Sequence, residues 1–180
     1  MRILLAVDGS ECSLEGVRNM TVHARWYRTK PEVDLVNVQP LLPYEGRVSQ
    51  VMGRDQVERY YREEGDAALA RAAKMLGAAG IEYRCRIFVG PAAETVAEQA
   101  KALRCDLIVM GAYGRTPLGQ AALGSVALKV LHIAEVPVQL VRLTGPLGDG
   151  IFAIDRTNPA SADAAGRQPR VETRACSPIR

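Results

Sequence analysis

The stretch that decides the fold is MGAYGRTPLGQAALGSV, residues 110–126. It follows residues 106–110 (DLIVM), which have the character of a buried strand, and it leads into a helical segment. A strand, a loop of small residues and a helix N-terminus expose backbone N–H groups, and the helix end carries roughly half a positive charge. The stretch therefore predicts an anion site, and the phosphates of a nucleotide are the first ligand to consider.

Two common phosphate-binding loops are excluded. A P-loop needs GxxxxGK followed by Ser or Thr, and this string does not occur in the chain. A dinucleotide fingerprint needs GxGxxG after the first strand, whereas the turn there reads DGSEC, residues 8–12. The chain instead has G-x-x-G, nine residues and then G-S, starting at Gly111. This spacing between a strand and a helix is more specific than three glycines alone.

Strand-like and helix-like segments alternate along the chain. The predicted strands are residues 2–7, 33–38, 81–89, 106–110 and 136–142. The first predicted helix starts after Ser10, and three more cover residues 55–79, 93–103 and 121–134. A break at Gly65 is an alternative for the helix over residues 55–79. This order predicts an α/β fold of Rossmann-like, HUP type: a single domain with an open, mostly parallel five-stranded sheet and helices on both faces. We expect strand order 3-2-1-4-5, because it brings the ends of strands one and four together at a switch point.

The chain changes character after residue 143. Residues 144–180 are rich in Gly, Pro, Ala, Ser and Arg, and residues 151–154 (IFAI) are their only compact apolar run. Such a segment buries too little apolar surface to offset its ordering entropy. We therefore predict one α/β domain over residues 1–143 and a disordered tail over residues 144–180. The net charge of +3 forms no basic face, so a nucleic-acid partner is not expected.

Cysteine spacing and the N-terminal residues bear on whether the protein binds zinc, is secreted or spans a membrane. The four cysteines form no CxxC and the chain has two histidines, so the spacing disfavours a zinc site. The first strand is too short, and too soon followed by Asp8, for a signal peptide or a membrane span. We expect a cytoplasmic protein with no membrane partner. Cys12, near the predicted site, is either a redox-sensitive thiol or a small buried hydrophobe.

Three segments carry a family resemblance: ILLAVDGSECS (residues 3–13), MGAYGRTPLGQAALGSVALKVL (residues 110–131) and VPVQLVR (residues 136–142). Together they resemble the universal stress protein family over about residues 1–143. The spacing G-x-x-G, nine residues, G-S is the motif of the ATP-binding branch of that family. The resemblance implies ATP as the ligand, with or without Mg²⁺, and a homodimer paired through the last strand, residues 136–142.

The resemblance also implies a place for individual residues along the nucleotide. Asp8 lies near the ribose and adenine, and the backbone of Val38 meets the adenine edge. The ribose and phosphate side is lined by Gly111 and Gly114. The β- and γ-phosphates are held at the helix start, by Gly124, Ser125 and Val126. In our own interpretation Arg115 adds a charge-assisted contact. The alternative for Asp8 is to brace the following turn, and the alternative for the glycines is to serve a tight turn only.

We expect an ATP-binding protein of stress response or signalling that acts through nucleotide-dependent conformation and dimerisation toward an unidentified signalling partner. Two alternatives stay open: a weak ATPase or nucleotide-processing enzyme, and a nucleotide-free dimeric adaptor. The enzyme is disfavoured, because no Lys lies on the phosphate loop and no His or acidic pair is set to activate water.

Overall fold

Five parallel strands form one sheet in a computed structural model of the chain, which describes residues 1–27, 29–42, 54–114 and 123–143. The sheet order is β3-β2-β1-β4-β5, so the predicted order and the α/β fold class are confirmed. The strands are β1 (Arg2–Ala6), β2 (Glu32–Gln39), β3 (Tyr83–Val89), β4 (Leu107–Gly111) and β5 (Val138–Val141). The predicted tail, residues 144–180, lies outside the described residues.

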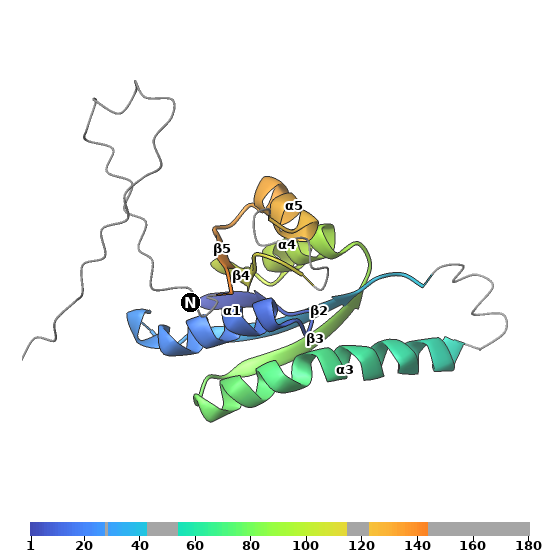
Figure 1. The fold of residues 1–180 in the computed structure, drawn as a ribbon, viewed down its shortest axis with the longest axis horizontal. Helices are drawn as coiled ribbons and strands as arrows, with labels where there is room; N and C mark the ends of the chain where they lie inside the picture. The colour runs from blue at the N-terminus through green and yellow to red at the C-terminus, as the bar shows by residue number, and fades with distance from the viewer. Residues whose placement is uncertain (28, 43–53, 115–122, 144–180) are drawn as a thin grey trace, which may run out of the picture. The chain divides into compact units, whose positions relative to one another are not determined.

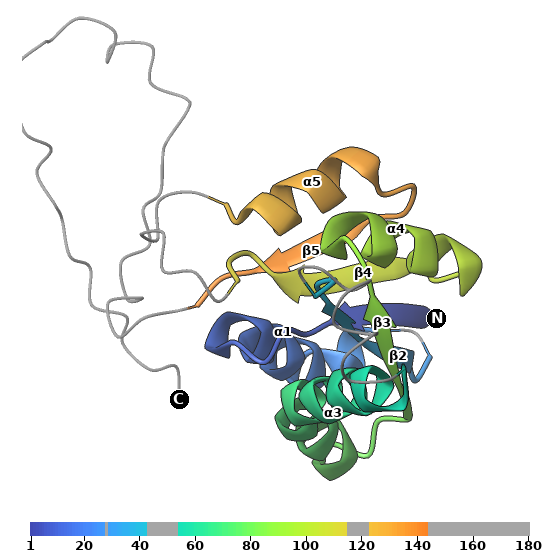
Figure 2. The same ribbon diagram turned by 90° about the vertical axis from the view of Figure 1, so that its right-hand side faces the viewer.

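Helices cover both faces of the sheet, as Figures 1 and 2 show: α1 and α3 lie on one face and α4 and α5 on the other. The helical segments are α1 (Glu11–Val22), the short 3₁₀ segment η1 (Ala24–Trp26), α3 (Arg54–Ala78), α4 (Ala92–Ala102) and α5 (Ser125–Ile133). Among the described residues, no helix is long and apolar enough to cross a membrane.

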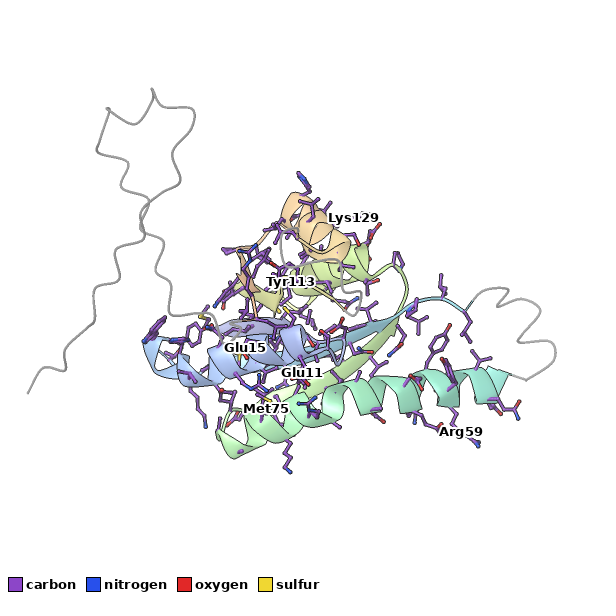
Figure 3. All side chains as sticks on the ribbon, in the orientation of Figure 1. Glu11, Glu15, Arg59, Met75, Tyr113 and Lys129 are labelled. Carbon is purple, nitrogen blue, oxygen red and sulfur yellow. The ribbon has the colours of Figure 1, made fainter. Side chains whose placement is uncertain are left out.

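The core explains why β1 is apolar at successive positions. Side chains alternate across a strand, so Ile3 and Leu5 join the cluster under α1 and α3, while Leu4 joins the cluster under α4 and α5. A strand that is buried on both faces reads as a continuous hydrophobic run. The outer pairing of α1 with α3 is reinforced by Glu11, which Figure 3 labels and whose carboxylate accepts a hydrogen bond from Arg71 at 2.6 Å.

The helix predicted over residues 55–79 is continuous, because α3 runs without a break from Arg54 to Ala78, and the alternative of a break at Gly65 does not occur. A Cβ at Gly65 would lie only 2.6 Å from Cδ1 of Ile87 in β3. Glycine at position 65 therefore lets the helix pack closely on the sheet, and this contact outweighs the low helix propensity of glycine.

Strands β3 and β5 each begin two residues later than predicted, for local reasons. Strand β3 begins at Tyr83 because Ile81 closes α3 instead, donating its N–H to the carbonyl of Leu76 at 3.0 Å after Gly80 turns with φ +64°. Strand β5 begins at Val138, directly after Pro137, which has no N–H to offer to the ladder.

Candidate functional site

A cavity of about 640 Å³ opens at the carboxyl ends of β1, β2 and β4, on the face that α4 and α5 cover. This is the switch point that the strand order predicts, where the chain departs from β1 and β4 in opposite directions. Seven of the eight predicted site residues line the cavity: Asp8, Val38, Gly111, Gly114, Gly124, Ser125 and Val126. The eighth, Arg115, lies outside the described residues.

Asp8 presents one of its two oxygens to the cavity. Oδ1 accepts hydrogen bonds from the backbone N–H of Ser10 at 3.0 Å and from its hydroxyl at 2.6 Å, so Asp8 does brace the turn into α1. Oδ2 lies beside Gly114, where a Cβ would be 3.4 Å away. No donor in the described part of the chain is bonded to Oδ2, which leaves it as an acceptor for a ligand hydroxyl.

Helix α5 begins later than the sequence predicted. The expected start at residue 121 is wrong, because Gly124 is the N-cap, with extended φ −61° and ψ 147°, and Ser125 is the first helical residue. The glycine has no side chain to cap the helix, and the first intrahelical bond runs from Leu128 N–H to the Gly124 carbonyl. The first-turn amides, which no N-cap side chain occupies, can thus donate at the cavity that Ser125 and Val126 line.

A second helix start reaches the same cavity. Gly90, Pro91 and Ala92 line it, and Pro91 is the N-cap of α4, again without a side-chain hydrogen bond to the helix. Both helices direct the positive ends of their dipoles toward this space. The described lining contains no Lys or Arg, and Asp8 is its one carboxylate. Attraction of an anion by the described lining therefore comes from backbone amides and helix ends.

Side chains that the sequence analysis did not select support the site from behind and from its rim. Asn37 is fully buried, and its amide donates to the carbonyl of Val7 at 2.8 Å. Tyr113, labelled in Figure 3, lines the cavity, with the guanidinium carbon of Arg142 5.7 Å from its ring centre. The signal for Asn37 was available, because an amide inside the apolar run of β2 has to find a partner.

Cys12 is buried, with 3 % of its surface exposed, and its Sγ lies 3.4 Å from the carbonyl oxygen of Val141. It does not line the cavity. The arrangement favours the small buried hydrophobe over the redox-sensitive thiol. No group of three or more His, Cys, Asp or Glu side chains in the described ranges is placed to hold a metal ion.

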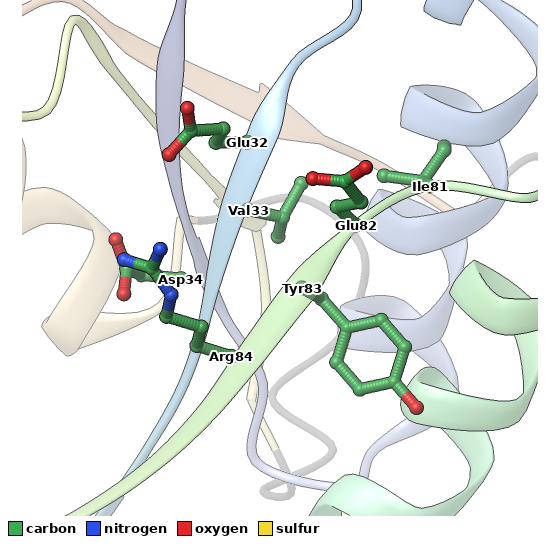
Figure 4. A pocket seen from close by; sticks show the side chains of 7 residues that line it. All are labelled: Glu32, Val33, Asp34, Ile81, Glu82, Tyr83 and Arg84. Atoms are coloured by element: carbon green, nitrogen blue, oxygen red, sulfur yellow. The ribbon is translucent and has the colours of Figure 1, made fainter.

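A smaller cavity of about 330 Å³ lies at the opposite end of the strands, beside the amino ends of β2 and β3 (Figure 4). Asp34, 2 % exposed, accepts hydrogen bonds there from Nε of Arg2 and Nε of Arg86, each at 2.7 Å. Burial raises the pKa of this carboxyl, but the two guanidinium groups lower it by more, so the net shift is downward. These charges compensate one another, and the arrangement reads as a structural ion cluster.

The model of the universal stress protein family matches residues 1–142. The chain belongs to the universal stress protein family. Among curated relatives it is similar to universal stress protein MJ0531 of Methanocaldococcus jannaschii, with 32% identity over 144 residues that cover 78% of this chain and 81% of the relative.

Solved structures of this universal stress protein's relatives agree with its fold. The chain is similar to the hypothetical protein MJ0577, with a TM-score of 0.67, 25% identity and coverage of 80% of this chain and 96% of that one. A universal stress protein in complex with cAMP gives a TM-score of 0.53 at 24% identity, covering 78% and 96% of the two chains. A family member from Arabidopsis thaliana with AMP bound gives 0.55 at 14% identity, covering 79% and 91%.

Proposed function

We propose that this universal stress protein binds an adenine nucleotide, ATP in the first place, in the cavity at the ends of β1, β2 and β4. The observation that carries the proposal is the gathering of seven sequence-selected residues around one cavity that two uncapped helix starts also reach. AMP and cAMP in two structural relatives support an adenine ligand.

The lining suits the parts of a nucleotide. The apolar side of the cavity, which includes Val38, takes the adenine, and Oδ2 of Asp8 accepts a hydrogen bond from a ribose hydroxyl. The amides at the start of α5, from Ser125 onward, donate to the terminal phosphates, and Arg115 adds a positive charge. Where Mg²⁺ accompanies the nucleotide, the phosphate oxygens would hold it.

The protein acts in the cytoplasm through occupancy of this site, and nucleotide-dependent conformation and dimerisation through β5 alter the surface that a signalling partner reads. A weak ATPase is less well supported, because the described lining holds no Lys and no His. A nucleotide-free adaptor is also less well supported, because it would not need an open cavity between β1 and β4.

Isothermal titration with ATP, ADP, AMP and cAMP, each with and without Mg²⁺, tests the proposal. The informative variant is Gly114→Ala, whose new methyl group lies beside Oδ2 of Asp8, where the ribose is expected. The matched control is Gly77→Ala in α3, because a Cβ at Gly77 has no neighbour within 4 Å.

We expect one ATP per wild-type chain, an affinity at least about ten-fold lower in Gly114→Ala, and no loss in the control. A folded wild-type protein that takes up none of the four nucleotides would overturn the proposal. Turnover above background that disappears in Gly114→Ala would favour the enzyme instead.

A further inference from the structure

Two amide side chains lie at the carboxyl end of β2, behind the nucleotide cavity. Asn37 is 0 % exposed and Gln39 is 7 % exposed, and neither lines the cavity. Alternation along β2 places both on the face that carries Val33 and Leu35, which is the face covered by α1 and α3. Burying an amide is costly unless it is hydrogen-bonded, so the partners of these two side chains show what they do.

The two amides form a directed chain of hydrogen bonds. Nε2 of Gln39 donates to Oδ1 of Asn37 at 2.7 Å, and Nδ2 of Asn37 donates to the carbonyl oxygen of Val7 at 2.8 Å. Each hydrogen bond joins one amide donor to one acceptor, so the two hydrogen bonds together determine the orientation of both amide groups.

This chain of bonds reaches β1 where that strand leaves the sheet. The paired register of β1 with β2 ends at Ala6 and Val36, after which Val7 donates its N–H to the Val36 carbonyl. The Asn37 amide then holds the carbonyl of Val7, which belongs to the next peptide unit, the one that joins Val7 to Asp8. The next residue is Asp8, so this bond restrains the backbone from which the Asp8 carboxylate projects.

The opposite end of the chain of bonds is tied to β3. The backbone carbonyl of Gln39 accepts a hydrogen bond from the N–H of Gly90 at 2.9 Å, and Gly90 lines the cavity. We infer that the Gln39–Asn37 amide pair positions the nucleotide site, holding the ends of β1, β2 and β3 in register so that Asp8 meets the ribose. The inference rests on the proposed function, and both amides are positioning residues that do not touch the ligand.

Asn37→Asp separates positioning from simple packing, because it keeps the size of the side chain. An ionised carboxylate at position 37 still accepts from Gln39 but cannot donate to the Val7 carbonyl, whereas a protonated carboxyl can donate. Burial favours the neutral form, so the lost donor returns as the pH falls. A positioning role therefore predicts a pH-dependent defect in nucleotide affinity.

The experiment is isothermal titration of ATP into wild type, Asn37→Asp and a control at pH 8, 7 and 6. The control is Asn19→Asp in α1, which undergoes the same chemical change at another amide pair: Asn19 accepts from Gln139 at 2.9 Å and does not line the cavity. Wild type carries the same other titratable groups as the variants, among them Asp8 after β1, Cys12 in α1 and Tyr61 in α3. Titrating it in parallel cancels their contribution.

We expect Asn37→Asp to bind ATP at least about ten-fold more weakly than wild type at pH 8, with the gap narrowing at pH 6. We expect the control to stay within about two-fold of wild type at each pH. A folded Asn37→Asp protein with wild-type affinity at pH 8 overturns the inference, as does a defect of the same size at every pH.

If Asn37→Asp does not fold at pH 8, Gln39→Met is the second variant, since it keeps Asn37 and removes only the hydrogen bond that Gln39 donates to it. A few-fold loss of affinity supports the inference, and unchanged affinity overturns it. If wild type binds no adenine nucleotide, the proposed function fails, and amide hydrogen exchange without ligand decides the positioning role. Faster exchange at residues 7–10 in either variant, with unchanged rates elsewhere, supports that role, and unchanged rates at residues 7–10 overturn it.

Discussion

Gly111 lies against the backbone of Cys12 so closely that a Cβ at Gly111 would be 2.9 Å from the Cys12 carbonyl carbon. The end of β4 and the first turn of α1 therefore meet at backbone contact. Gly114 is different, because among the described residues its Cβ would meet only Oδ2 of Asp8, at 3.4 Å. The two glycines of the G-x-x-G motif thus have different structural roles. Gly111 is required by packing, and Gly114 keeps space open in the cavity.

This difference predicts opposite phenotypes for two alanine variants. Gly111→Ala forces α1 and β4 apart and should lower the free energy of unfolding by about 1–3 kcal/mol. Gly114→Ala should stay within about 0.5 kcal/mol of wild type while it loses nucleotide affinity. Urea denaturation followed by circular dichroism measures both, and equal stabilities for the two variants would contradict the assignment.

The strand order and the position of the cavity could be predicted because they follow from local patterns. The apolar run of β1 indicates a strand buried on both faces, and the spacing of Gly111, Gly114 and Gly124 marks the turn after β4. The reason for Gly111 could not be predicted, since its contact with Cys12 joins residues far apart in sequence.

The start of α5 and the role of Asn37 show the same limit. The residues Ala121, Ala122 and Leu123 have high helix propensity, which is why the sequence predicted an early start, but the helix begins after Gly124. A polar residue in β2 was visible in the sequence, but its partner, the Val7 carbonyl, is thirty positions away and is brought close only by the parallel pairing of β1 and β2.

Tyr61 should matter for nucleotide binding although it lies on α3. Its phenol oxygen accepts a hydrogen bond from the N–H of Leu42 at 2.9 Å, and the neighbouring Leu41 lines the cavity. Tyr61→Phe removes this acceptor, so we expect a loss of about 1 kcal/mol in stability and a few-fold weaker ATP binding by titration. Tyr60→Phe is the matched control, because Tyr60 is 44 % exposed. Equal effects of the two variants would argue against a role of the Tyr61–Leu42 hydrogen bond in nucleotide binding.

The proposed dimer can be tested at the open edge of β5. The carbonyls of Pro137 and Val141 accept hydrogen bonds from Ile108 and Ala112, so in a parallel ladder the N–H of Leu140 points away from β4. Leu140→Pro therefore removes a donor that a partner strand would use, while the bonds to β4 remain.

We expect Leu140→Pro to sediment as a monomer and Leu140→Ala, which keeps the N–H, to stay dimeric in analytical ultracentrifugation. The alanine variant controls for the apolar contact that the leucine makes with the core. A proline variant that remains dimeric at the same concentration would show that pairing does not use this edge.

The ion cluster around Asp34 predicts a stability that depends on pH. The pKa of Asp34 is lowered in the folded protein, because the bonds from Arg2 and Arg86 outweigh the effect of burial. A lowered folded-state pKa means that the stabilisation is present above the unfolded value of about 3.9 and is lost as the pH falls through the folded value. Asp34→Asn should therefore cost about 2–3 kcal/mol at pH 7, moderated because both arginines keep contact with water.

Urea unfolding of wild type and Asp34→Asn at pH 7, 5, 4 and 3 measures this dependence. The difference between the two proteins should be constant from pH 7 to pH 5 and should shrink below about pH 4, where Asp34 takes up a proton in the unfolded wild-type chain before it does so in the folded protein. Glu58→Gln is the control, because the Glu58–Arg62 pair is exposed and should contribute less than about 1 kcal/mol. A difference that persists undiminished at pH 3 would mean that Asp34 stabilises the fold through its shape and hydrogen-bond geometry, with its charge contributing little.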